Sequence, residues 1–246
     1  MEHTIGILGG MGPAATADML SKFVLFRHAP RDQQHIPVIA CSIPDIPDRS
    51  ACLLAGGPSP YDYLERYLHL LEHAGAECIV IPCNTAHYWY ERLHAAASAE
   101  MISILDATLS ELPSGCMAVG LLATDATLAT GLYQQKIEQR GLTFLTPKEE
   151  RQQAVMQAIY ALKGGDEAKA QALLFPQIAD LIASGADTLI MGCTEIPLVI
   201  GRQTARFDCR FIDSTAALVR AAIRWYEGKQ GEITPPAISL ATSTID

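Results

Sequence analysis

The sequence has little positive charge and no segment in which it gathers. Its 18 Lys and Arg residues stand against 27 Asp and Glu, which gives the 246-residue chain a formal net charge of −9. Proteins that bind nucleic acid neutralise phosphates with clustered Lys and Arg. The composition therefore argues against a nucleic-acid partner.

Long apolar runs and closely paired cysteines are also missing. No apolar run approaches the roughly 20 residues that cross a bilayer, and the N-terminal Met1-Glu2-His3-Thr4 lacks the positive charge that begins a signal peptide. The seven cysteines include no C-x-x-C pair, so the sequence predicts neither a disulfide framework nor a Cys-rich zinc site. We expect a protein of a reducing compartment, the cytoplasm, with no membrane partner.

What the sequence does contain is a regular alternation of short apolar runs and longer helical patterns, in a chain that is 49% hydrophobic. This alternation predicts an α/β fold whose parallel sheets are covered on both faces. The expected strands are Thr4–Gly9, Pro37–Ile43, Glu77–Pro82, Met101–Asp106, Met117–Ala123, Leu142–Leu145, Thr188–Gly192 and Arg210–Asp213. The expected helices are Ala14–Phe26, Tyr61–Ala74, Thr85–Ala97, Thr127–Arg140, Pro147–Leu162, Asp166–Ser184 and Ser214–Glu227.

Two segments of the first half recur, in the same order, in the second. Residues 77–85 match 187–195, each an apolar strand followed by Pro or Gly, a cysteine and a nearby threonine. Residues 4–9 similarly match 118–123. The repeats predict two similar α/β domains with parallel sheets, formed by residues 1–113 plus 208–228 and by residues 114–207. The last strand and helix are expected to complete the first sheet, and residues 229–246 to form a C-terminal tail.

Two repeated cysteines, Cys83 and Cys193, follow predicted strands. Ligands of parallel sheets bind outside the carboxyl ends of the strands, so two facing halves bring both thiols to opposite walls of one cleft, the expected active site. Unpaired N–H groups at a strand-to-helix junction favour a thiolate. Two such sulfurs suit a reaction in which a proton leaves one face of a carbon and returns to the other.

The residues beside these cysteines suit a supporting role. Asn84-Thr85 and Thr194 are good hydrogen-bond donors for an anionic ligand. Asp125, Thr124 and Thr127 are further candidates for the wall of the cleft, and Thr124 is the one expected to bind substrate. His87 lies one helical turn after Cys83, and Glu195 lies two residues after Cys193. Either can adjust its thiol or carry its proton, and a carboxylate so near also holds the proton on sulfur.

Two other patterns have rival interpretations. The segment Gly10-Met11-Gly12-Pro13-Ala14-Ala15 fits a dinucleotide-binding fingerprint, but the second strand ends without the acidic residue that binds ribose. We expect the Met11-Gly12 backbone to offer N–H groups to a substrate carboxylate instead. His87, Glu91 and His94 share one helix face and make a metal site conceivable, but an amphipathic helix with inward aromatics is the favoured interpretation.

Three segments together resemble a known family. Residues 9–16 (GGMGPAAT), 82–87 (PCNTAH) and 192–197 (GCTEIP) are similar to the signatures of the aspartate/glutamate racemase family, and to its aspartate racemase branch more than to glutamate racemase, which typically has His where this chain has Glu195. The resemblance covers about residues 3–227. It implies two α/β halves, no pyridoxal phosphate, no metal and a homodimer.

The resemblance also implies roles for individual residues. It makes Cys83 and Cys193 the acid/base pair, has Asn84 and Thr85 bind substrate, and matches Arg49 and Lys163 to cations of that branch. Charge supports this, because an acidic amino acid brings two carboxylates to a protein already at −9.

These residues together predict a cofactor-independent racemase of an acidic amino acid, aspartate first and glutamate as an alternative. A related two-cysteine isomerase or decarboxylase of a small dicarboxylic acid, and a non-catalytic protein that binds an acidic metabolite, stay open as alternatives.

Overall fold

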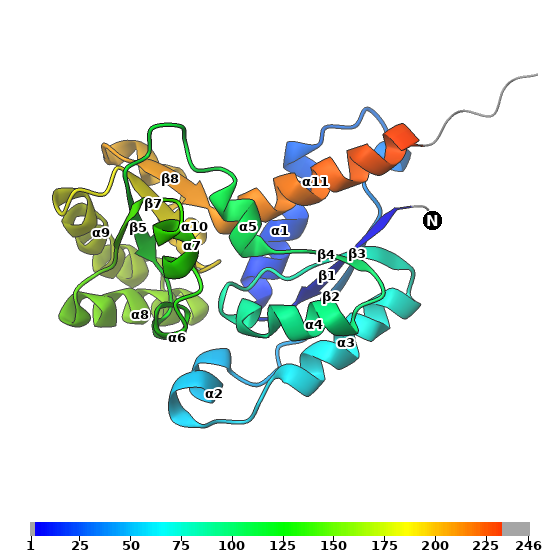
Figure 1. The fold of residues 1–246 in the computed structure, drawn as a ribbon, viewed down its shortest axis with the longest axis horizontal. Helices are drawn as coiled ribbons and strands as arrows, with labels where there is room; N and C mark the ends of the chain where they lie inside the picture. Colours follow the sequence, from blue (N-terminus) through cyan, green and yellow to red (C-terminus); the bar gives the residue numbers. More distant parts are fainter. Residues whose placement is uncertain (1–2, 233–246) are drawn as a thin grey trace, which may run out of the picture.

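A computed structural model describes residues 3–232 of the protein. It contains two four-stranded parallel sheets (Figure 1). The first sheet has the order β2-β1-β3-β4 and the second the order β6-β5-β7-β8. The strands of the first are β1 (Thr4–Gly9), β2 (Val38–Ser42), β3 (Ala76–Val80) and β4 (Glu100–Ile102). Those of the second are β5 (Ala118–Leu122), β6 (Thr143–Leu145), β7 (Thr188–Met191) and β8 (Arg210–Asp213). The shared order confirms the predicted pair of similar α/β halves.

The register of the central strands positions the cysteines. In the first sheet Ile7 of β1 pairs with Val80, the last residue of β3. In the second, Leu122 of β5 pairs with Met191, the last residue of β7. Each cysteine therefore follows a central strand, at the carboxyl edge where ligands of parallel sheets bind.

Helices cover both sheets. In the first half, α1 and α11 contact one side of the sheet, and α3 lies on the other (Figure 1). The first half contains α1 (Pro13–Phe26), α2 (Arg49–Ala55), α3 (Tyr61–His73), α4 (Tyr90–Ala96), α5 (Ile104–Leu109) and the 3-10 turns η1 (Asp32–Gln34) and η2 (Thr85–Trp89). The rest of the chain contains α6 (Asp125–Ala129), α7 (Gln134–Glu138), α8 (Glu149–Lys163), α9 (Glu167–Ala183), α10 (Ile196–Ile200), η3 (Gly201–Arg206) and α11 (Ser214–Glu232).

One apolar cluster extends across both halves, so the two sheets share part of their core. This buried cluster contains Val80 of β3, Leu121 of β5, Ile190 of β7 and Leu218 of α11. Separate clusters lie under α3 in the first half and under α9 in the second. Burial of this shared apolar surface stabilises the arrangement of the two sheets relative to each other.

The last strand corrects the predicted domain assignment. Residues 208–228 were expected to complete the first sheet, but β8 pairs with β7 and forms the edge of the second. The helix after it, α11, packs on α1 and α5 of the first half as expected. The chain thus crosses from one half to the other at Asp213-Ser214. Residues 233–246, most of the expected tail, lie outside the described residues.

Several helices differ from the prediction because short capping signals outweigh apolar periodicity. The expected strand Met101–Asp106 ends early because Ser103 caps α5, its side chain accepting a hydrogen bond from the Asp106 N–H. The expected helix Thr127–Arg140 is divided at Gly131, which has a φ of 65°. The expected helix Thr85–Ala97 begins as the η2 turn before α4. The short helices α2 and α10 were not expected.

None of the helices within residues 3–232 is long and apolar enough to cross a membrane.

Candidate active site

The structure brings the two repeated cysteines together. Cys83 and Cys193 are each 6% exposed and line one narrow cavity between the halves. Its free volume is about 20 Å³, room for roughly one water molecule. The cavity is also lined by Met11, Asp48, Arg49, Ser50, Asn84, Thr85, Thr124, Lys163, Gly192, Thr194 and Glu195. Any molecule larger than water needs more room, so the walls must separate if one is to enter.

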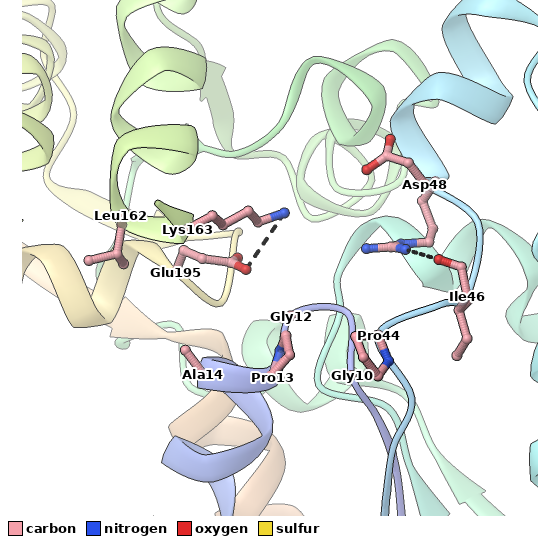
Figure 2. A pocket seen from close by; sticks show the side chains of 11 residues that line it. Gly10, Gly12, Pro13, Ala14, Pro44, Ile46, Asp48, Leu162, Lys163 and Glu195 are labelled. Atoms are coloured by element: carbon pink, nitrogen blue, oxygen red, sulfur yellow. Dashed lines mark hydrogen bonds and ion pairs between the residues drawn. The ribbon is translucent and has the colours of Figure 1, made fainter. Parts of the chain in front are cut away.

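A larger cavity of about 550 Å³ adjoins this gap (Figure 2). The two share the charged residues Asp48, Arg49, Lys163 and Glu195. The rest of the wall is small or apolar and comes from Gly10, Gly12, Pro13, Ala14, Pro44, Ile46 and Leu162. The charges thus stand where a polar molecule would pass from the larger cavity to the cysteines.

Cys193 is held in its protonated form. Its thiol donates a hydrogen bond to Oε2 of Glu195, 3.0 Å away. Burial raises the pKa of Cys193 well above its usual value, and the negative charge of Glu195 raises it further. This thiol therefore rests as an acid.

Lys163 lies beside this carboxylate and lines the same gap as the two sulfurs. It is the last residue of α8, which ends at Gly164, and its Nζ lies 3.7 Å from Oε1 of Glu195. Burial opposes its charge, but attraction to Glu195, Cys193 and Cys83 outweighs burial and raises the pKa of Lys163. A cation so placed stabilises negative charge on either sulfur.

Cys83 has a different neighbour. His87 Nδ1 donates to the Cys83 carbonyl oxygen at 2.8 Å, and Nε2 accepts from the Ile104 N–H at 2.9 Å. Burial lowers the pKa of His87 to about 4, so the ring is neutral near pH 7. Both ring nitrogens are occupied by backbone groups, and His87 lines neither cavity. Of the two supporting roles expected for His87, these bonds leave no ring nitrogen to carry the thiol's proton, and the ring instead ties the end of β3 to α5.

The same two bonds remove the metal alternative built on His87, Glu91 and His94, since no ring nitrogen of His87 is left to coordinate. Within the described part of the chain, no group of three His, Cys, Asp or Glu side chains is placed to hold a metal ion.

Arg49 is nine-tenths buried although it begins a helix. Its Nη1 donates to the carbonyl oxygens of Ile46 and Pro47, and its Nη2 donates to that of Met11 at 3.4 Å. These carbonyls hold the guanidinium against both cavities. Asp48 caps the same helix, its side chain accepting from the Ala51 N–H. The position of Arg49 matches the prediction from the motif.

Asn84 is at the centre of a buried network that links the halves. Its Nδ2 donates to Ser214 Oγ at 3.0 Å, and its Oδ1 accepts from the Tyr133 hydroxyl at 2.6 Å. Ser214 Oγ in turn donates to the carbonyl oxygen of Met191, at the end of β7. Asn84 lines the gap as predicted, but much of its hydrogen-bonding capacity serves to fix both strand ends.

Thr85 and Thr124, the threonines expected to bind substrate, meet in a triangle with Thr127. The three hydroxyl oxygens lie 2.9–3.0 Å apart. Thr85 comes from the first half and the other two from the second, so the triangle also joins the halves. Thr127 is fully buried beneath the two that line the gap.

The glycine-rich loop before α1 is held by its own helix. Thr16 Oγ1 accepts from the Gly10 N–H at 2.9 Å, so this N–H is not free for a ligand. Gly10 has a φ of 94°, and a side chain there would collide with the backbone of Ile43. Met11 lines the gap, Gly12 lines the larger cavity, and Pro13 begins α1, one residue before the predicted start.

All the predicted site residues except His87, Asp125 and Thr127 thus line either the narrow gap around Cys83 and Cys193 or the larger cavity beside it. Asp125 and Thr127 were expected beside Thr124 in the cleft wall but line neither cavity. Tyr133, Ser214 and Thr16 were not predicted.

Comparison with known proteins agrees with this geometry. Residues 8–222 match the model of the Asp/Glu/Hydantoin racemase family. A broad-specificity amino-acid racemase of Bacillus subtilis is 28% identical over 90% of this chain and 97% of its own length.

Solved structures are similar over the whole fold. The Picrophilus torridus aspartate racemase is 31% identical with a TM-score of 0.84, covering 92% of this chain and 94% of that one. An aspartate racemase homologue from Pyrococcus horikoshii is 25% identical with a TM-score of 0.73, covering 92% of this chain and all of its own. The chain therefore belongs to the Asp/Glu/Hydantoin racemase family and is an isomerase.

Proposed function

We propose that this protein interconverts the enantiomers of an acidic amino acid, aspartate first, with Cys83 and Cys193 as an acid/base pair and without an organic cofactor. The observation that carries the proposal is the shared gap, in which two sulfurs from equivalent strand ends face the same small volume. Similarity to aspartate racemases and to a broad-specificity amino-acid racemase supports the reaction class.

In one direction of the reaction Cys193, whose thiol donates to Glu195, is the acid and Cys83 is the base. The Cα–H bond of the substrate breaks as a proton moves to the Cys83 sulfur, and the Cys193 thiol gives its proton to the opposite face of Cα. Cys83 ends as a thiol and Cys193 as a thiolate beside Lys163, and the reverse reaction restores the starting state.

Two features lower the energy of the carbanion formed between these steps. Negative charge spreads from Cα onto the α-carboxylate, for which the cations of Arg49 and Lys163 on the wall of the gap are donors. The tight gap also excludes water around the reacting carbon, which strengthens each of these interactions.

The test is a chirality-resolved assay of the purified protein with each enantiomer of aspartate and glutamate, without added pyridoxal phosphate. We expect aspartate to racemise from both directions. Cys83→Ala and Cys193→Ala should each lower the rate at least about 1,000-fold, whereas Cys209→Ala, a half-buried cysteine outside the site, should change it little. Near-normal activity in either site variant, with the fold intact by circular dichroism, would refute the mechanism.

The alternatives give different products from the same sample. A decarboxylase converts aspartate to a monocarboxylic amino acid, which NMR distinguishes from racemised aspartate. A binding protein retains aspartate without taking solvent deuterium into the α-position.

A further inference from the structure

One carboxylate oxygen in the site lacks a hydrogen-bond partner. Glu195 is 3% exposed, and its Oε2 accepts from Cys193 and Thr194. Its Oε1 is fully buried and accepts no hydrogen bond from any described residue. A buried acceptor without a donor costs free energy, so this oxygen is placed for a donor that a ligand brings.

The unpartnered oxygen faces the cavities. A Cβ atom on Gly12 would lie 3.3 Å from Oε1, so only the absence of a side chain at Gly12 leaves this approach open. In Figure 2, Glu195 and Lys163 point together into the space above Gly12. Both residues line the narrow gap and the larger cavity. A ligand beside the cysteines therefore has Oε1 within its reach.

The charges of the site match an amino acid only if Glu195 takes part in binding. Arg49 and Lys163 are the cations that line both cavities, and Asp48 and Glu195 are the anions. Two carboxylates of an acidic amino acid can bind the cations. Its ammonium group needs an anionic acceptor, and Asp48 already accepts from the Ala51 N–H as a helix cap.

We propose that Oε1 of Glu195 binds the α-ammonium group of the substrate and so selects α-amino acids over diacids that lack an amine. This inference rests on the proposed function, because it names the substrate group that the same site recognises. Glu195 then has two functions: Oε2 holds the Cys193 proton and Oε1 holds the ammonium.

Substrate entry in this scheme is an exchange of ion-pair partners. In the free protein Lys163 and Glu195 face each other at 3.7 Å. A substrate carboxylate takes Lys163, and the ammonium takes its place on Glu195. No charge is left unpaired in the cavity, which keeps the cost of burying a zwitterion low. A diacid without an amine takes Lys163 and leaves the Glu195 charge alone.

The experiment measures binding rather than turnover, because Glu195 also contacts Cys193. Calorimetry gives the Kd of aspartate and of succinate, which has the same carbon chain and carboxylates but no amine. The unaltered protein should bind aspartate more tightly than succinate. Glu195→Gln should weaken aspartate binding about 10- to 100-fold, the range for a hydrogen bond to a charged group, and leave succinate binding equal or tighter.

Asp48→Asn is the matched control, since it neutralises the other carboxylate on the same walls. It should change the two Kd values by the same factor. The inference is overturned if Glu195→Gln weakens both ligands equally or leaves aspartate binding unchanged. This outcome is separable from failure of the proposed function, which appears as absent racemisation by the unaltered protein even if it prefers aspartate to succinate.

Discussion

The two strand ends that carry the cysteines differ in the side chain that lies just beyond each sulfur. At both, a central strand is followed by Cys and a polar residue that lines the gap. After Cys83, the neutral ring of His87 bonds to the backbone. After Cys193, the carboxylate of Glu195 bonds to the sulfur itself. The repeated fold thus provides equivalent positions for the two cysteines. His87 fixes the backbone after Cys83, whereas Glu195 keeps the proton on the Cys193 sulfur.

The largest expected effect is the loss of racemisation when either cysteine is replaced, and the exchange that remains should show which face of the substrate each sulfur contacts. Cys83→Ser and Cys193→Ser should each abolish racemisation, a loss of at least about 1,000-fold. In deuterated water each variant should still exchange the α-proton of one enantiomer, because the remaining cysteine faces that proton. NMR of L- and D-aspartate measures the exchange.

The two variants should select opposite enantiomers. If both exchange the same enantiomer, one base serves both faces and the two ends do not divide the reaction between them.

His87 belongs to the Cys83 end alone and should make stability depend on pH. Burial lowers its pKa to about 4, whereas a free histidine has a pKa of about 6.5. Between these values the unfolded chain binds a proton that the folded chain excludes, so the free energy of unfolding falls as the pH falls. The full loss is about 3 kcal/mol.

Urea denaturation between pH 7 and pH 4 measures this slope. His87→Gln should flatten it, and His94→Gln, at an exposed position of α4, should not. An equal slope in the unaltered protein and His87→Gln would show that the ring is not kept neutral by burial.

A smaller effect is expected from the hydrogen-bond network around Asn84, which links the two strand ends. Tyr133→Phe removes the hydroxyl that donates to Asn84 and leaves a buried acceptor unpaired. The free energy of unfolding should fall by about 1–2 kcal/mol, measured by urea denaturation. Tyr160→Phe, at an exposed position of α8, is the matched control and should be neutral. A neutral Tyr133→Phe would mean that water or another donor replaces the hydroxyl.

The smallest expected effect is a shift in the pH at which Cys193 becomes reactive. The negative charge of Glu195 adds to burial in raising the pKa of Cys193, so Glu195→Gln should lower it. Alkylation of Cys193 by iodoacetamide, followed by mass spectrometry, should then begin at a lower pH than in the unaltered protein. Cys209, outside the site, serves as the internal reference. An unchanged pH dependence at Cys193 would contradict the assigned effect of Glu195.

The sequence predicted the strands well and the cross-links between halves poorly, for physical reasons. Buried strands leave continuous apolar runs, and repetition of residues 77–85 as 187–195 revealed their equivalence. The last strand was misassigned because an apolar run does not say which sheet it joins. Helices α2 and α10, of two turns or fewer, are too short to show an apolar period.

In the site, too, residues at motifs were predicted and contacts between distant residues were not. Cys83 and Cys193 were predicted because each follows a recognisable strand, and Arg49 and Lys163 were predicted from the family resemblance. The bond between Asn84 and Ser214 joins residues 130 positions apart. No local pattern indicates such a bond. Ser214 and Tyr133, which both bond to Asn84, are of residue types too common to be singled out from the sequence alone.

The crossing of the chain at Asp213-Ser214 affects how the protein can be divided. A fragment ending before residue 208 would lack β8 and α11, leaving β7 as an open sheet edge and the apolar face of α5 and α1 uncovered. Such a fragment would expose aggregation-prone surface in both halves at once. The halves are therefore not exchangeable modules, and a chimera with another member of the family must take its last strand and last helix from different parents to match both halves.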